Sequence, residues 1–494
     1  MFYPDFEMVK ALAGDFNIIP VSMEVYADMD TPISMFKKLE NSGGCFLLES
    51  VEGGEKWGRY SFMGRNPFIS VKGTGGNSTI SYREGKTVEI SKNPFDTIKE
   101  LMSSYRSAVL PGMPRFNGGA VGFFGYDTVR YFENLPDIPV DDVGLPELHF
   151  MFADEIIAFD HLRQKIHIIV NMHVGGNIER AYNTTIDRIR EVYREIIASR
   201  SRLENNGTGT VSKEAKQLNI QSNISKEEFC SNVEKAREYI RNGDIFQVVL
   251  SQRFVAETDS DPFNVYRALR IINPGPYMYY LKFDGYTIVG SSPEMLVRME
   301  DGIVETCPIA GTRKRGLTEE EDNLLAEELL SDEKERAEHV MLVDLGRNDI
   351  GKVSEFGSVT VRDFMHIERY SHVMHLVTAV QGRLKSGLTA FDALSAVLPA
   401  GTLSGAPKIR AMEIIDELET TKRCHYGGAV GYLSFNGNLD SCITIRTILF
   451  KNGKAYIQAG CGIVADSDPD KEYEESVNKS MAALKALEEA GKIR

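Results

Sequence analysis

The chain contains many short apolar segments that end at glycine, asparagine or aspartate, and this pattern restricts its fold more than any other feature. Segments such as FQVVLSQRFV, YMYYLKF, AVGYLSF and AYIQAG are bounded by turn sequences that include FNGNLD and KNGKA. Such spacing is typical of antiparallel hairpins. Helical patterns at 226–242, 318–345, 406–419 and 470–490 alternate irregularly with these segments. We therefore predict an antiparallel α+β fold rather than a doubly wound parallel sheet.

A polar segment at residues 199–223 marks the clearest change of composition. Its sequence, SRSRLENNGTGTVSKEAKQLNIQSN, is rich in Gly, Ser, Thr and Asn and lacks an apolar period, which is typical of a linker. A helical pattern at about 176–200 precedes it. We predict an N-terminal domain over residues 1–198 and a second domain over residues 224–494.

Composition and charge limit the classes of function. The 494 residues are 42% hydrophobic and 26% charged, as in ordinary soluble proteins. The net charge of -15 would repel nucleic acid and anionic lipid, so we expect neither nucleic acid nor a membrane as partner. No apolar run approaches the roughly 18 residues of a membrane helix, and the N-terminus lacks a signal-peptide pattern. The six cysteines are scattered singly, which is typical of reduced thiols, and we expect a cytoplasmic protein.

Two nearly identical segments lie about three hundred residues apart. GGAVGFF spans residues 118–124 and GGAVGYL spans residues 427–433, and each places two glycines before a short strand pattern. Chance could produce this similarity. Our hypothesis is that the two segments occupy related positions in a two-part sheet assembly.

A glycine- and hydroxyl-rich loop leads directly into the helical pattern at 406–419. Gly401 and Gly405 allow close approach of the backbone, while Thr402 and Ser404 offer hydroxyls. Lys408 adds a positive charge near the free N–H groups of the helix start. The loop therefore resembles an anion site, although an ordinary capped helix would have the same pattern.

Glutamates at helical spacing are the candidate metal ligands. Glu335 and Glu338 continue an apolar stripe, although carboxylates resist burial unless they are paired or bind a metal. In the last helical pattern Glu472 pairs with either Glu474 or Glu475, and the apolar period leaves that choice open. If the two pairs converge, an all-oxygen ligand set favours Mg²⁺.

Three further residues could carry charge or protons. His375 and His372 titrate near neutral pH, and Arg446 lies in a β-branched segment where a guanidinium generally needs an anionic partner. For each, a purely structural role is the alternative. No phosphate-binding loop or dinucleotide fingerprint is present in the sequence, and Cys461 does not match a glutaminase nucleophile motif.

Taken together, these segments resemble the large subunit of anthranilate synthase, a chorismate-utilising enzyme, over nearly the whole chain. The resemblance rests on these matching motifs in the expected order: LLES (47–50), NPGPYMYY (273–280), SSPEMLVR (291–298), PIAGTRKRG (308–316), EHVMLVDLGRND (338–349), HVMHLVTAV (372–380), GTLSGAPK (401–408), GGAVGY (427–432) and QAGCGIV (458–464). It implies an antiparallel β-sandwich core with helices outside and two interleaved subdomains.

The resemblance also implies a site. Mg²⁺ would be held by Glu338 and Glu475, with Glu335 and Glu472 as neighbouring carboxylates. Chorismate would bind these residues: Gly311, Thr312, Tyr426, Arg446, Gly460, Cys461 and Gly462. Glu294, which must be protonated at working pH, would be the general acid that helps hydroxide to leave, and His375, Thr402 and Gln247 complete the catalytic set.

Two positions distinguish the reactions of this family. Isochorismate and salicylate synthases have a lysine that activates water where this chain has Gln247, and an amide cannot act as that base. Aminodeoxychorismate synthase, the rival assignment, has a lysine where this chain has Ala310. The resemblance therefore implies that ammonia is the nucleophile and that anthranilate and pyruvate are the products.

A partner and an inhibitor follow from the same resemblance. The sequence has no glutaminase motif, so a separate glutamine amidotransferase subunit would supply ammonia. Tryptophan would inhibit the enzyme by binding at Ser50, Pro276, Tyr277 and Met278, which lie in the LLES and NPGPYMYY segments. Without the resemblance, these segments would be a strand end and a rigid proline turn.

Overall fold

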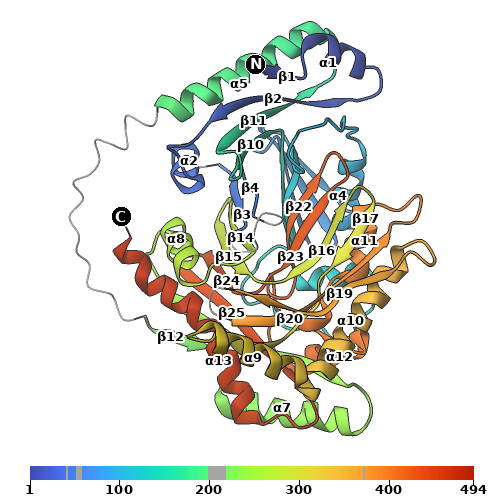
Figure 1. The fold of residues 1–494 in the computed structure, drawn as a ribbon, viewed down its shortest axis with the longest axis vertical. Coiled ribbons are helices and arrows are strands. Elements are labelled where there is room, and N and C mark those ends of the chain that lie inside the picture. The colour runs from blue at the N-terminus through green and yellow to red at the C-terminus, as the bar shows by residue number, and fades with distance from the viewer. Residues whose placement is uncertain (41–42, 52–57, 199–217, 371–372, 494) are drawn as a thin grey trace.

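A computed structural model describes residues 1–40, 43–51, 58–198, 218–370 and 373–493. Two large antiparallel sheets occupy the middle of the molecule, and helices surround them (Figure 1). The helices of the described residues are α1 (Phe6–Leu12), α2 (Pro32–Leu39), α4 (Pro94–Ser103), α5 (Ile178–Ala198), α7 (Lys226–Arg241), α8 (Pro262–Ile272), α9 (Glu319–Ser331), α10 (Glu333–Val353), α11 (Ala390–Val397), α12 (Lys408–Leu418) and α13 (Pro469–Glu489).

Within the described residues, the first sheet has 13 strands and the second has 12. The first sheet runs in the order β1 (Phe2–Tyr3), β2 (Ile18–Tyr26), β11 (Lys165–His173), β10 (Glu155–Asp160), β4 (Tyr60–Arg65), β3 (Cys45–Glu49), β14 (Tyr277–Phe283), β15 (Tyr286–Ser292), β24 (Thr447–Lys451), β25 (Lys454–Ile463), β13 (Gln247–Glu257) and β12 (Ile220–Ser222), with β21 (Gly405–Ala406) beside β13. The second runs β18 (Ile309–Lys314), β20 (Val373–Arg383), β17 (Ile303–Thr306), β16 (Met295–Glu300), β23 (Leu439–Ile443), β22 (Ala429–Ser434), β8 (Gly119–Phe124), β9 (Leu148–Ala153), β5 (Ile69–Thr74), β6 (Asn77–Tyr82) and β7 (Thr87–Ile90), with β19 (Thr360–Arg369) beside β20.

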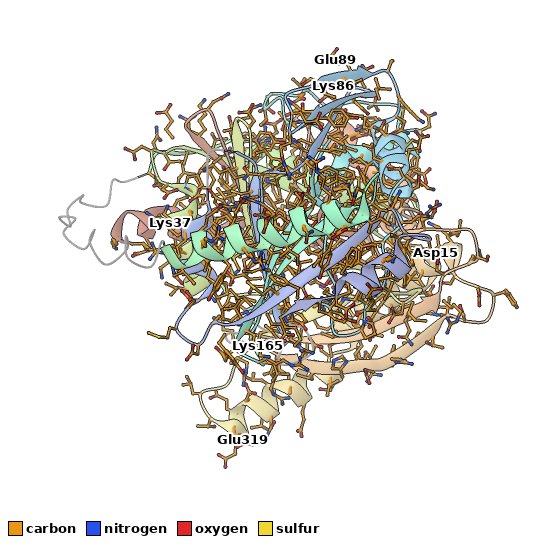
Figure 2. The ribbon with its side chains drawn as sticks, turned by 90° about the horizontal axis from the view of Figure 1, so that it is seen from above. Asp15, Lys37, Lys86, Glu89, Lys165 and Glu319 are labelled. Carbon is orange, nitrogen blue, oxygen red and sulfur yellow. The ribbon has the colours of Figure 1, made fainter. Side chains whose placement is uncertain are left out.

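The sheets pack face to face because their strands are apolar on both sides. Phe62 packs in the core between the sheets, whereas its neighbour Met63 faces the helices α2, α5 and α8 on the other side. In the second sheet, Val121 faces the inner core and Ala120 faces α10 and α11. This alternation is the strand period of two, and it confirms the predicted α+β sandwich. Figure 2, which views the molecule from above, shows α5 lying across the face nearest the viewer, and Lys86, Glu89 and Glu319 near the edge of the molecule.

Strands from the two halves of the chain are mixed in both sheets. β3 pairs with β14 in the first sheet, and β8 pairs with β22 in the second. The second pair confirms our hypothesis about the repeated segments, since Gly122 lies opposite Gly431 and the two strands are neighbours. Residues 199–217 of the predicted linker lie outside the described residues, and β12 follows them as an edge strand beside β13. The segment near 199–223 therefore divides the chain in sequence but not in space, because both halves contribute strands to each sheet.

One predicted helix was wrong. The pattern at 318–345 forms two helices, α9 and α10, which are separated at Asp332. Asp332 has an extended backbone, and its carboxylate accepts from the N–H groups of Lys334 and Glu335 at 3.0 and 3.1 Å. This N-cap starts α10 and gives its first turn a fixed direction.

Candidate active site

A cavity of about 650 Å³ lies where α10 and α13 meet the ends of both sheets. This volume is suitable for a small organic ligand. Every residue that the sequence predicted for catalysis, metal binding or chorismate lines the cavity, except Cys461. The predicted lining residues are Gln247, Glu294, Gly311, Thr312, Glu335, Glu338, His375, Thr402, Tyr426, Arg446, Gly460, Gly462, Glu472 and Glu475.

Arg446 forms the positive end of the cavity. Its backbone has a φ of 52°, which is unusual for a residue with a side chain, and burial lowers the pKa of its guanidinium. Within the described part of the chain, the guanidinium has no hydrogen-bond acceptor or ion-pair partner, although Tyr426 lies nearby. A half-buried arginine without an anion is a strong candidate for binding a ligand carboxylate.

Glu294, the candidate proton donor, is hydrogen-bonded to Thr402. Burial raises the pKa of Glu294 to about 7, and Thr402 Oγ1 donates a hydrogen bond to Glu294 Oε1 at 3.0 Å, which opposes part of that rise. A carboxyl group with this pKa is partly protonated at neutral pH and can act as a general acid. Glu294 is half-buried in the wall of the cavity, and its pKa is raised as the general-acid role requires.

His375 is oriented by the irregularity of strand β18 at Gly311. His375 Nδ1 lies 2.9 Å from the carbonyl oxygen of Gly311 and 3.1 Å from Thr312 Oγ1. A carbonyl oxygen only accepts, so Nδ1 carries the proton and the neutral ring has its acceptor at Nε2. Burial lowers the pKa of His375, which favours this neutral form. Gly311 has a φ of 67°, and a Cβ there would lie 3.2 Å from Glu335 Oε2.

Four glutamates from α10 and α13 also line the cavity, and the charge of Glu475 opposes part of the fall in the pKa of Arg446. Burial raises the pKa of Glu338, and the carboxylates of Glu335 and Glu475 raise it further. Burial likewise raises the pKa of Glu472, and Glu475 again adds to the rise. Like charges so placed repel each other unless a cation lies between them.

The donor set fits Mg²⁺ better than a more demanding metal. Among the residues that the structure describes, no three Asp, Glu, His or Cys side chains come close enough to form a cage. Mg²⁺ typically takes one or two carboxylates and completes its shell with water and ligand oxygens. Glu338 and Glu475, on facing helices, are suited to that arrangement.

Gln247 and Lys408 have contacts that the sequence could not give. Gln247 Nε2 donates to Glu338 Oε1 at 3.4 Å, and in the described structure Gln247 Oε1 is buried without a donor. Lys408 does not line the cavity. Its Nζ donates to Asp349 Oδ2 at 2.6 Å and to the carbonyl of Val397 at 3.1 Å. Lys408 therefore holds the start of α12 against α10 and the end of α11.

Comparison with known proteins identifies the family. A family model described as chorismate binding enzyme matches residues 45–485. A protein of Acetivibrio thermocellus named anthranilate synthase component 1 is 67% identical over 494 residues, which cover 100% of both chains. The chain belongs to the chorismate-binding enzyme family. A protein of Aquifex aeolicus with the same name is 48% identical over 98% of this chain and 97% of its own.

Solved structures agree with this membership. The chorismate-binding enzyme has a TM-score of 0.77 and 42% identity to anthranilate synthase component I from Streptococcus pneumoniae, covering 93% of this chain and 98% of that one. Its TM-score to the menaquinone-specific isochorismate synthase of Escherichia coli is 0.70 at 17% identity, covering 98% of both chains. The second likeness concerns the fold alone, so the fold does not by itself select the reaction.

Two positions of this chorismate-binding enzyme, Cys461 and Lys479, need comment. Cys461 was predicted to bind chorismate through its backbone, and its side chain packs on the other face of β25, in the core beneath α7 and α12. Strand alternation places Gly460 and Gly462 in the cavity instead. Lys479, which the sequence analysis missed, lines the cavity and lies 2.7 Å from Glu475 Oε1. Its spacing of four from Glu475 was the only signal in the sequence.

Glu474 and Glu475 differ in position. Glu475 lines the main cavity together with Glu472, whereas Glu474 lines only a neighbouring open pocket that Glu475 also borders. His372, the other histidine considered, lies outside the described residues. No helix of the described chain is long and apolar enough to cross a membrane.

A second cavity brings together the four residues predicted to bind tryptophan. Ser50 follows β3, and Pro276, Tyr277 and Met278 begin the neighbouring strand β14. The cavity lies between the two sheets, and its other walls are formed by Leu48, Glu49, Tyr60, Phe62, Arg115, Tyr279, Arg298, Val430, Gly431, Tyr432, Asp440 and Cys442. Its volume is about 50 Å³, and its walls combine aromatic rings with Glu49 and two arginines that already pair with Asp440.

Proposed function

We propose that this enzyme is the large subunit of a cytoplasmic anthranilate synthase that converts chorismate and ammonia into anthranilate and pyruvate in tryptophan biosynthesis. The observation that carries the proposal is one cavity that combines an arginine without an ion-pair partner among the described residues and a group of glutamates whose charges repel each other. A dianion such as chorismate can bind Arg446 with one carboxylate. Its second carboxylate can approach Glu338 and Glu475 only with a cation, so substrate and Mg²⁺ should bind with positive coupling.

Each group has a role in holding the substrate. Glu338 and Glu475 would hold Mg²⁺, with Glu335 and Glu472 as outer carboxylates, and the ion would neutralise the ring carboxylate when bound. Arg446, Tyr426 and Lys479 would hold the enolpyruvyl carboxylate. The backbone at Gly311, Thr312, Gly460 and Gly462 leaves room for the ring.

Proton transfers follow from the protonation states. Glu294 would donate a proton to the C4 hydroxyl, so that it leaves as water while ammonia attacks C2. In the second step the C3–O bond breaks, and His375 Nε2 would accept the C2 proton. The enolpyruvate that leaves takes up a proton to give pyruvate, and the ring becomes aromatic.

Two residues of the cavity restrict which nucleophile the enzyme can use. Gln247 and Ala310 both line it, and neither can act as the lysine base or nucleophile of related enzymes. The buried Gln247 Oε1 can accept a hydrogen bond from ammonia. The second candidate, aminodeoxychorismate synthase component I, would need a catalytic lysine at the position of Ala310.

One assay tests the proposal. Purified protein with chorismate, Mg²⁺ and ammonium at alkaline pH should form fluorescent anthranilate and pyruvate. Glutamine should replace ammonium only when a glutamine amidotransferase subunit is added. A non-aromatic amino product would favour the second candidate. Absence of any product from folded protein, or use of glutamine by the single chain, would contradict the proposal.

We further propose that tryptophan inhibits the enzyme from the second cavity. Replacing Ser50 with phenylalanine should leave turnover without tryptophan within about twofold and raise the inhibitory tryptophan concentration at least about tenfold, because the added ring occupies a wall of the cavity. Inhibition curves for both proteins measure this. Normal sensitivity in the variant would count against this cavity as the tryptophan site.

A further inference from the structure

The two cavities are separated by one short segment of the first sheet. Ser291 and Ser292 end β15, which lies beside β14 and β24 (Figure 1). Both serines are buried, with exposed fractions of 1% and 0%, and neither lines either cavity. Pro293 and Glu294, the next residues, line the active-site cavity. The chain therefore passes from behind one cavity to the wall of the other within about 7 Å.

Ser291 connects the 273–278 segment to Arg446. Its hydroxyl donates to the carbonyl of Asn273 at 2.6 Å, and its backbone N–H donates to the carbonyl of Arg446 at 3.2 Å. Gly275 packs against the same hydroxyl, because a Cβ there would lie 2.9 Å from it. The carbonyl of Gly275 accepts from the N–H of Val51, directly after Ser50. Ser291 thus contacts the 273–278 segment and the backbone of the substrate arginine, while Gly275 connects that segment to Val51.

Ser292 makes the corresponding connection to Glu294. It lies opposite Tyr277 in the β14–β15 pair, and its hydroxyl hydrogen-bonds to the thiol of Cys442, which lines the second cavity. The same hydroxyl donates to the carbonyl of Glu294 and accepts from its N–H, both at 3.4 Å. The backbone that positions the candidate general acid is therefore held by a residue that lies beside Tyr277 and Cys442 in the lining of the second cavity.

We propose that Ser291 and Ser292 are positioning residues that transmit occupancy of the second cavity to Arg446 and Glu294. The proposal rests on the function proposed above. A ligand that displaces the 273–278 segment or Cys442 must alter these contacts, because buried hydroxyls cannot exchange them for water. The resulting shift at Arg446 and Glu294 would favour a state that binds chorismate poorly. By linkage, chorismate would weaken tryptophan binding by the same factor.

The test uses Ser291→Ala in the full chain with Mg²⁺ and ammonium. The factor by which saturating tryptophan raises the KM for chorismate should fall at least about fivefold, the lower end of typical coupling. The Kd of tryptophan measured without chorismate, and the kcat and KM without tryptophan, should stay within about threefold. A purely structural defect would also change tryptophan binding or the kinetics without tryptophan, so it would not lower the coupling alone.

Ser434→Ala is the matched control. Ser434 is 3% exposed and its hydroxyl donates to the carbonyl of Gly118 at 3.0 Å, so a buried bond of the same kind is lost at a residue that lines neither of the two cavities. The control should keep the wild-type coupling. Unchanged coupling in folded Ser291→Ala, or an equal loss in Ser434→Ala, would overturn the inference.

A second variant covers a folding failure. If Ser291→Ala does not fold, Ser291→Cys, which keeps the side-chain shape with a weaker donor, is judged by the same criteria. If the wild type forms anthranilate but tryptophan neither binds nor inhibits, the inference fails with the regulatory proposal while the catalytic proposal stands. If tryptophan inhibits the wild type and the Ser291 variant equally, only the inference fails.

Discussion

Glu294→Gln is expected to lower turnover with ammonia by about 10²–10⁴-fold, the usual contribution of a positioned general acid. The amide has nearly the shape of the protonated carboxyl, so Thr402 can still contact it, but it cannot donate a proton as an acid. The KM for chorismate should change little. Steady-state kinetics with saturating ammonium measure both parameters.

The same substitution should make folding less sensitive to pH. The pKa of Glu294 is raised from 4.5 to about 7 in the folded protein. Between these pH values the folded state therefore keeps a proton on Glu294 that the unfolded state has lost. Wild-type stability from this group is therefore present below pH 4.5 and is lost as the pH rises through about 7. Relative to wild type, Glu294→Gln should gain about 2–3 kcal/mol of unfolding free energy between pH 5 and pH 8. Denaturant unfolding without Mg²⁺ at the two pH values measures this difference.

Either of two results would contradict the assignment of Glu294 as a general acid with a raised pKa. One is a variant that keeps more than about a tenth of wild-type turnover, which is too much for a lost general acid. The other is a stability difference between variant and wild type that is the same at pH 5 and pH 8. Kinetics and stability thus test the acid role and the raised pKa separately.

Glu475→Gln is expected to raise the Mg²⁺ concentration for half-maximal activity by about 100-fold or more, since loss of even an outer partner of a metal ligand costs 10–100-fold. Glu338→Gln should behave alike, because the two residues face each other across the cavity. Mg²⁺ titrations of activity and calorimetric Mg²⁺ binding with and without chorismate measure the effect.

Glu474→Gln provides the matched control. It removes the same charge from the adjacent position of α13, where the side chain is exposed and outside the main cavity. Its Mg²⁺ requirement should change less than about threefold, as expected for an exposed surface charge. If Glu474→Gln had the larger effect, the assignment of Glu475 would be wrong.

Local patterns were sufficient for most of the fold. Hairpin turns and strand segments predicted the antiparallel α+β class, and the family resemblance named active-site residues that, apart from Cys461, all line the cavity. The single helix predicted at 318–345 was wrong because Asp332 accepts from two N–H groups and starts a new helix, which an apolar period does not record. Lys479 was missed because only its contacts with Glu475 and the carbonyl of Gly460 distinguish it from other helix lysines.

The sequence by itself determined which side chains are available: glutamates in two helices, an arginine in an apolar segment, and a hydroxyl-rich loop. The strand predicted at Arg446 was wrong, because this residue lies in the connection between β23 and β24 with a φ of 52°. Only the tertiary structure decided what each of them faces. Glu474 and Glu475 lie about 100° apart around α13, so the packing of that helix against β25 and α8 selects which one enters the cavity. Lys408, equally basic in sequence, is paired with Asp349, while Arg446 has no partner among the described residues. The physical reason is that charge and helical period are local properties, whereas burial and partners depend on segments brought together from both halves of the chain.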